Sequence, residues 1–120
     1  VAWGAIVREV EKAVQLVANE NISVEIIDLR TIAPLDTETV VNSVKKTGRL
    51  LVVHEAPKSY GPAAELISLV NEKAFYSLEA APVRVTGFDI TVPLARGEHY
   101  YFPQPERIAA KLKELAKARP

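Results

Sequence analysis

Four consecutive apolar residues, Leu50 to Val53, constrain the fold of this chain most strongly. A strand of this composition has no polar face, so it must be covered on both sides, as is typical of a central strand in a parallel sheet. The run ends at His54-Glu55-Ala56-Pro57, where Pro57 cannot donate a ladder hydrogen bond. Because ligands and partners of open α/β sheets meet the carboxyl ends of central strands, His54 and Glu55 mark the first place to look for function.

Short extended segments alternate with amphipathic helices along the rest of the chain. Further strands are expected near residues 1–3, 23–28 and 83–86, and the alternation Val-Arg-Val-Thr predicts that the last of these lies at a sheet edge. Helices are expected after Gly4, after Asp36 as N-cap, from Pro62 and from Pro105. The pattern predicts one α/β domain over residues 1–120, a three-layer α/β/α fold with a mainly parallel, Rossmann-like sheet. The expected strand order is 24, 1, 50, 83, with the strand near residue 24 exposed.

Composition excludes several classes of function. Fifteen basic and fifteen acidic residues give a formal net charge of zero, so no electrostatic footprint for nucleic acid or an anionic membrane exists. No apolar run approaches the roughly 20 residues of a membrane span. Without cysteine there is no disulfide framework, thiolate nucleophile or cysteine-based metal site. Gly4 stands alone, without the glycines of a dinucleotide fingerprint, and His54 and His99 lack metal-binding spacing. These patterns therefore predict no cofactor-binding or metal-ligating residue, and they assign a catalytic role to no residue.

The His54-Glu55 pair admits two interpretations. It could be an acid–base pair, or a strand-end pair that satisfies loop backbone or meets another subunit. The second is favoured because no nucleophile accompanies the pair. The aromatic residues of the connector 87–104 could likewise form a binding face or pack the connector onto the sheet; they are Phe88, Tyr100, Tyr101 and Phe102.

The chain begins without an initiator methionine, in what reads as the second half of a strand. A domain is unlikely to start this way, so we expect a fragment, or a chain whose earlier part is missing.

Several sequence blocks, taken together, resemble a known family. They are Ala2-Trp3-Gly4, Ile27-Asp28-Leu29-Arg30-Thr31-Ile32-Ala33-Pro34-Leu35-Asp36, Lys46-Thr47-Gly48-Arg49-Leu50, His54-Glu55-Ala56-Pro57, Leu78-Glu79-Ala80 and Val85-Thr86-Gly87-Phe88-Asp89. In this order they resemble the C-terminal, transketolase-type domain of the β subunit of 2-oxo acid dehydrogenases, over essentially the whole chain. Gly87-Phe88-Asp89 leans toward the branched-chain rather than the pyruvate enzymes.

The resemblance implies a function in a multienzyme complex. The family's α2β2 enzymes decarboxylate a 2-oxo acid and acylate lipoyl groups, with thiamine diphosphate and magnesium held by the α subunit and the N-terminal domain of β. The present piece would therefore bind no cofactor and be inactive alone, and an antiparallel strand would lie before Val1. The implied partners are the α subunit, a second β subunit and the subunit-binding domain of the lipoyl acyltransferase, in prokaryotic cytoplasm or the mitochondrial matrix.

The same resemblance implies site residues. Glu79 occupies the acidic position of the family's partner-docking loop, although Ala80-Ala81-Pro82 carries one extra alanine. Asp89 is a second candidate for partner binding, and His54 and Glu55 are candidates for the subunit interface. Two alternatives stay open at this point. One is the matching domain of another thiamine enzyme, a transketolase or a deoxyxylulose-phosphate synthase, and the other is a free-standing nucleotide-binding α/β module.

Overall fold

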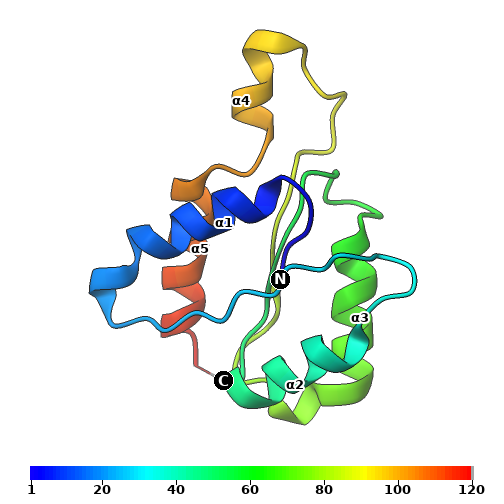
Figure 1. Cartoon of the computed structure of the whole chain (residues 1–120), viewed down its shortest axis with the longest axis vertical. Helices are drawn as coiled ribbons and strands as arrows, with labels where there is room; N and C mark the ends of the chain where they lie inside the picture. Colours follow the sequence, from blue (N-terminus) through cyan, green and yellow to red (C-terminus); the bar gives the residue numbers. More distant parts are fainter. Residues whose placement is uncertain (120) are drawn as a thin grey trace.

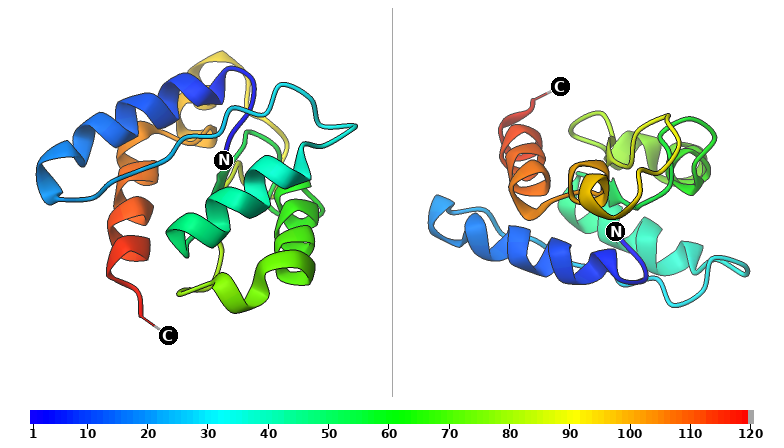
Figure 2. Two further views of the ribbon diagram at one scale, coloured as in Figure 1. Left: turned by 60° about the horizontal axis from the view of Figure 1, so that its bottom comes forward. Right: turned by 90° about the horizontal axis from the view of Figure 1, so that it is seen from above.

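The computed structural model describes residues 1–119, which form three layers (Figures 1 and 2). A parallel sheet lies in the middle. Helices α1 (Ile6–Leu16) and α5 (Pro105–Lys117) cover one face, and α2 (Thr37–Thr47) and α3 (Pro62–Ala74) cover the other. The predicted three-layer α/β/α class is confirmed, while Pro120, the last residue of the predicted domain, lies outside the described residues.

The sheet is short and has the predicted order. Strand β1 (Leu51–Val53) pairs in parallel with β2 (Val83–Val85), which has no further neighbour among the described strands. On the other side, Ala2 forms parallel bridges to both Val53 and Asp28. The order Asp28, Ala2, β1, β2 therefore confirms that the apolar run lies inside the sheet and that the strand near residue 83 lies at an edge.

The strand predicted over residues 23–28 is only partly formed. Residues 22–27 have no strand assignment, and Asp28 alone makes a bridge. The prediction of a complete strand is wrong: Ile27 and Leu29 form backbone hydrogen bonds with Ala2, whereas residues 22–26 take part in none of the ladder bonds of the described chain.

The predicted helix starts after Asp36, at Pro62 and at Pro105 are confirmed. The Asp36 side chain accepts a hydrogen bond from the Thr39 N–H at 3.0 Å and so caps α2. Gly48 ends this helix in the left-handed region at φ 70°, where a side chain would be strained. Pro62 and Pro105 stand in the first turns of α3 and α5.

Two hydrophobic cores flank the sheet because successive side chains of β1 point to opposite faces. Leu51 and Val53 pack with α1 and α5, whereas Leu50 and Val52 pack with α2 and α3. Val52 and Val53 are both almost fully buried. The strand is thus covered on both sides, as its composition predicts.

The connector after β2 is not structureless. It contains a short 3-10 turn, η3 (Ala95–Gly97), and a short helix, α4 (Glu98–Tyr101), and it projects from the body beyond the carboxyl ends of the strands (Figure 1). Tyr101 is buried, but Phe88 and Tyr100 are exposed, so only part of the aromatic set packs inward. Two further 3-10 turns are η1 (Ala18–Glu20) and η2 (Phe75–Ser77). No helix within residues 1–119 is long and apolar enough to cross a membrane.

Candidate functional site

His54 follows β1 directly and is held inside the protein. Its N–H donates to the Val85 carbonyl at 3.1 Å, which extends the pairing of β1 with β2 by one residue. The imidazole is 1% exposed and stacks on Trp3 with ring centroids 5.4 Å apart. A Cβ at Gly61 would lie 2.8 Å from His54 Cε1, so the backbone before α3 closes the other side. Only glycine permits this close approach.

Neither ring nitrogen of His54 has a hydrogen-bond partner. Burial lowers the pKa of the imidazole because removal from water disfavours the charged form. The backbone of Ala56 acts in the opposite direction, but its geometry does not make a hydrogen bond with either ring nitrogen. The positive charge of Arg84 lowers the pKa further. His54 is thus stabilised in its neutral form and is enclosed by residues of its own chain.

Glu55 lies at the same edge but is exposed. Its carboxylate makes no hydrogen bond to His54, whose nitrogens have no partner, so the two residues do not form an acid–base pair. Glu55 remains a candidate for contact with another subunit, whereas His54 faces inward and is not available at the surface described here.

A second close approach lies beside His54, where the loop after β2 meets α4. A Cβ at Gly87 would lie 2.4 Å from the Glu55 carbonyl oxygen and 2.6 Å from Tyr101 Cζ. The Tyr101 ring therefore lies directly on this backbone, and its buried hydroxyl has no hydrogen-bond partner. Phe88 packs edge-on to Tyr101 at 6.3 Å and accepts the Arg107 guanidinium over its ring at 4.6 Å. The projecting connector is anchored to the sheet through these contacts.

Asp89, the second partner-binding candidate, is bound within its own chain. Its carboxylate accepts from the Ser59 N–H at 2.8 Å and from the Ser59 hydroxyl at 2.6 Å. These hydrogen bonds lower the pKa of the Asp89 carboxyl. The pair connects the loop after β1 to the loop after β2, so the Asp89 carboxylate has hydrogen-bond partners within its own chain.

Glu79 lies in the loop before β2, beside Gly48, and pairs with Arg49. Its carboxylate Oε2 lies 2.5 Å from the Arg49 guanidinium, and its N–H donates to the Gly48 carbonyl at 2.8 Å. Arg49 also donates to the carbonyls of Leu115 and Ala118 at 3.0 and 3.1 Å. We call this group of four residues, Arg49, Glu79, Leu115 and Ala118, the arginine clasp; it connects the end of α5 to the loop before β2.

The two partner-binding candidates lie at opposite ends of the sheet. Glu79 precedes β2 and lies at the amino end, whereas Asp89 follows β2 and lies at the carboxyl end. Glu79 keeps 60% of its side chain exposed and so can reach a partner, but it does so with Arg49 already bound. Sequence reasoning missed Arg49. An arginine directly before a buried strand was the available signal, but nothing local indicated that the end of α5 lies beside it.

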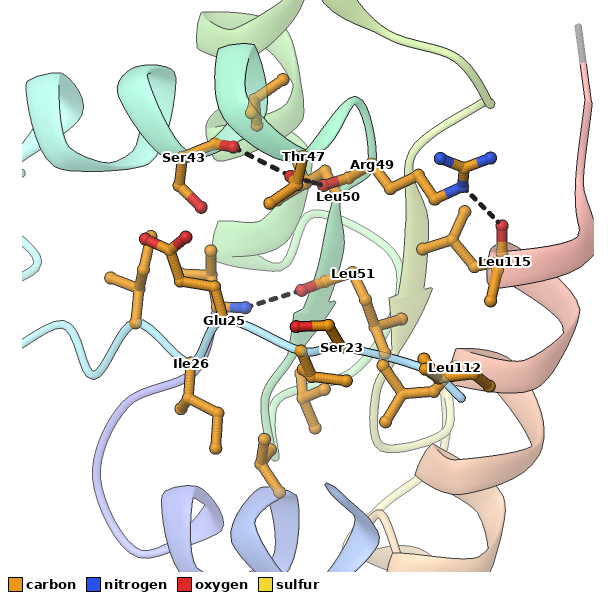
Figure 3. A pocket seen from close by; sticks show the side chains of 18 of the residues that line it. Ser23, Glu25, Ile26, Ser43, Thr47, Arg49, Leu50, Leu51, Leu112 and Leu115 are labelled. Atoms are coloured by element: carbon orange, nitrogen blue, oxygen red, sulfur yellow. Dashed lines mark hydrogen bonds between the residues drawn. The ribbon is translucent and has the colours of Figure 1, made fainter. Parts of the chain in front are cut away.

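A cavity of about 310 Å³ opens beside β1, between this strand and residues 21–27 (Figure 3). Leu112 and Leu115 of α5 line one side, and Ser43 and Thr47 of α2 line the other. Among the described residues that line it, Glu25 supplies the one carboxylate, and most of the others are apolar.

The described residues do not fit a magnesium–diphosphate site. Within residues 1–119, no three His, Asp or Glu side chains gather closely enough to hold a metal ion. The orphaned buried polar atoms at the carboxyl end belong to His54, Tyr101 and Arg107, which are not a magnesium ligand set.

The three-layer fold with its parallel sheet is matched by a known family of α/β domains. The model of the family "Transketolase, C-terminal domain" matches residues 1–108, and the chain belongs to this family. A pyruvate dehydrogenase E1 component subunit beta from Acholeplasma laidlawii is 78% identical over 120 residues, which are 100% of this chain and 37% of the relative.

Two further similarities extend the comparison. A 2-oxoisovalerate dehydrogenase subunit beta from Pseudomonas aeruginosa is 51% identical over 102 residues, or 84% of this chain and 29% of that one. A solved structure titled "Split gene transketolase, inactive beta4 tetramer" superposes with a TM-score of 0.84 at 18% identity and covers 99% of this chain and 39% of that chain. The last confirms the fold. The chain thus spans about 37% of the length of the 78% identical relative.

Proposed function

We propose that the chain is the C-terminal assembly and docking domain of the β subunit of a 2-oxo acid dehydrogenase. The observation that carries this proposal is the 78% identity over the whole chain to a pyruvate dehydrogenase E1 β subunit. Sequences this similar keep the same fold and surfaces, and the site described above offers contacts rather than chemistry. The two curated relatives named above are both dehydrogenase β subunits, which favours this function over a transketolase, a deoxyxylulose-phosphate synthase or a nucleotide-binding module. The transketolase structure, at 18% identity, supports the fold alone.

Pyruvate is the proposed substrate of the parent enzyme. Gly87-Phe88-Asp89 leans toward the branched-chain enzymes, but the relative at 78% identity is named for pyruvate, and the 2-oxoisovalerate enzyme follows at 51%. Identity over the whole chain is stronger evidence for the substrate than a block of three residues. Cytoplasmic placement in a bacterium is proposed on the same ground.

The parent enzyme is proposed to use thiamine diphosphate and magnesium held by its other domains. This chain would contribute to the contact with a second β subunit and with the α subunit. Glu55, exposed at the carboxyl end of β1, is the candidate for a subunit contact. The connector that projects beyond the same edge exposes Ile90 and Leu94, which fits a contact surface.

Glu79 is proposed to meet a basic group of the subunit-binding domain of the lipoyl acyltransferase. Its exposed carboxylate is held by Arg49 in one orientation, which reduces the entropy lost on docking. The same pairing partly neutralises Glu79, so the net charge that it offers depends on Arg49. Charge complementarity at such a rim sets mainly the association rate and its salt dependence.

A chimera tests this proposal. The present chain replaces the corresponding C-terminal segment of the A. laidlawii β subunit, which is coexpressed with its α subunit. We expect an assembled enzyme that oxidises pyruvate with an artificial acceptor at close to the parental rate and prefers pyruvate to 2-oxoisovalerate. A chimera that folds but does not assemble with α would contradict the assembly role, and preference for 2-oxoisovalerate would contradict the substrate.

Docking is measured in the same chimera with Glu79→Ala. We expect weaker binding of the acyltransferase subunit-binding domain and a smaller effect of salt, with unchanged turnover of pyruvate with the artificial acceptor. Glu65→Ala, on the exposed side of α3, is the matched control and should leave binding unchanged. Equal binding of the parental and Glu79→Ala chimeras at two salt concentrations would assign Glu79 to the arginine clasp alone.

A further inference from the structure

Tyr60 adopts a backbone conformation that its residue type avoids. Its φ is 55°, in the left-handed region, where the Cβ of a residue crowds the following carbonyl oxygen. Asn21 also lies in this region, at φ 58°, but asparagine tolerates it, whereas a bulky side chain there is an outlier. Glycine would adopt the same conformation without strain. The loop after β1 therefore carries a tyrosine where a residue without a side chain would be more stable.

The Tyr60 side chain does not stabilise the fold in return. It is fully exposed, so its ring buries no apolar area against residues 1–119. Packing of this ring inside the described chain consequently does not offset the strain of its backbone. Strained residues that persist in a fold cluster at functional positions, where the gain comes from a bound partner.

The backbone on both sides of Tyr60 is fixed by the surrounding structure. On the side before it, the Ser59 N–H and hydroxyl donate to the Asp89 carboxylate at 2.8 and 2.6 Å. On the side after it, Gly61 is packed so closely that a Cβ there would lie 2.5 Å from the Pro57 carbonyl oxygen. These contacts hold the strained residue in place and its ring in solvent. A side chain that is presented in this way loses less entropy when it binds.

Tyr60 belongs to a larger apolar surface at the carboxyl end of the sheet. Because Ser59 and Asp89 are hydrogen-bonded, the next residues along the two loops, Tyr60 and Ile90, flank the same contact. Ile90 is exposed, and so is Leu94 on the connector, which projects from this end of the molecule (Figure 1). A central aromatic anchor with apolar neighbours is typical of a protein–protein interface.

The charges at this end of the sheet are balanced. Glu55 and Lys58 lie in the loop that carries Tyr60, and Arg96 and Glu98 lie on the connector; all four are exposed. None of them has an ion-pair partner within residues 1–119. Two acidic and two basic groups fit a second copy of the same surface, because a two-fold axis brings the acidic groups of one copy toward the basic groups of the other. A strongly charged partner would instead require an excess of one sign.

We propose that Tyr60 is the anchor residue of a contact between this surface and a second copy of the chain, the second β subunit. The inference rests on the proposed assembly function and deepens it, because it names the anchoring side chain and its partner. The ring of Tyr60 enters the interface, and the Ser59–Asp89 hydrogen bonds keep it positioned for this contact.

The test uses the assembled chimera described above and three substitutions at Tyr60. Tyr60→Ala removes the ring but keeps a Cβ, and with it the backbone strain, whereas Tyr60→Gly removes both. Tyr60→Phe keeps the ring. Tyr76→Ala is the matched control, because Tyr76 is also fully exposed but lies at the end of α3, at the opposite end of the sheet. Analytical ultracentrifugation measures the dissociation constant of α2β2 into two αβ pairs.

We expect Tyr60→Ala and Tyr60→Gly to raise this dissociation constant about tenfold or more. Tyr60→Phe and Tyr76→Ala should change it by less than about threefold. A dissociation constant unchanged by Tyr60→Ala in an assembled chimera would overturn this inference alone, whereas a chimera that does not assemble would overturn the proposed function with it.

Two further outcomes would also overturn the inference. An effect of Tyr60→Ala that is absent in Tyr60→Gly would assign Tyr60 to the conformation of its loop rather than to a contact of its ring. Loss of the α subunit from a β pair that stays together would assign the surface to α instead of the second β subunit.

Discussion

Replacing Arg49 by methionine is expected to release the end of α5. Methionine keeps much of the aliphatic stem but removes every donor of the arginine clasp. Three interactions are lost: the hydrogen bonds to the Leu115 and Ala118 carbonyls, and the ion pair with Glu79. Arg49 is the group that holds these parts together because its planar fork reaches all three acceptors at once.

The magnitude follows from the exposure of the groups. Hydrogen bonds to a charged donor contribute about 1.5–3 kcal/mol, but a helix end can fray and let water bond to the freed carbonyls, so about 1 kcal/mol for each carbonyl is appropriate. The partner Glu79 is 60% exposed, so the ion pair adds at most about 1 kcal/mol. We expect the free energy of unfolding to fall by about 2–3 kcal/mol. The melting temperature should correspondingly fall by on the order of 10 °C.

The assay is urea unfolding followed by the fluorescence of Trp3, the single tryptophan of the chain. Lys46→Met is the matched control because Lys46 pairs only with Glu25 on an open surface, where a loss of about 0.5 kcal/mol is expected. Glu79→Gln, which removes the ion pair but keeps the carbonyl bonds, should fall between the two. Equal destabilisation by Arg49→Met and Lys46→Met would refute the argument that the clasp holds α5.

Three further outcomes test the packing. Gly87→Ala should lower the free energy of unfolding by about 1–3 kcal/mol or more, because the new Cβ would lie 2.4 Å from a backbone oxygen. Urea unfolding should show a larger loss for Gly87→Ala than for Gly4→Ala, because Gly4 has a positive φ but open space around it. Ile108→Ala, fully buried under α1, should cost about 2–5 kcal/mol in the same assay; a loss below 1 kcal/mol would contradict the burial. The pKa of His54 is lowered in the fold, so its stabilising effect is complete above the pKa of the unfolded chain, about 6.5, and is lost as the pH falls below it. Melting temperatures from pH 7.5 to 5 should therefore fall more in the parent than in His54→Gln, and parallel curves would contradict a buried neutral imidazole.

Much of the secondary structure could be predicted because its causes are local. The apolar run at Leu50 to Val53 required cover on both faces, and both faces are covered. Asp36, Gly48 and the prolines 62 and 105 act through their own backbone and side-chain geometry, so the starts and ends of the helices followed from residue type. The order of the strands could also be predicted, because right-handed crossovers allow few arrangements of parallel strands in a sheet.

The candidate site could be predicted only in part. Glu79 and Asp89 looked equivalent, two acidic residues in loops flanking one strand. The structure binds Glu79 to Arg49 and Asp89 to Ser59, at opposite ends of the sheet. No residue near Glu79 in the sequence indicated Arg49, because that contact depends on the parallel pairing of β1 with β2.

The sequence by itself determined the fold class, the helix ends and the buried central strand, since these depend on hydrophobic periodicity and on the conformations allowed to single residues. Tertiary structure decided which polar groups are free. His54 is enclosed by Trp3, which is distant in sequence, and by Gly61 before α3, and only the folded chain places both against the imidazole.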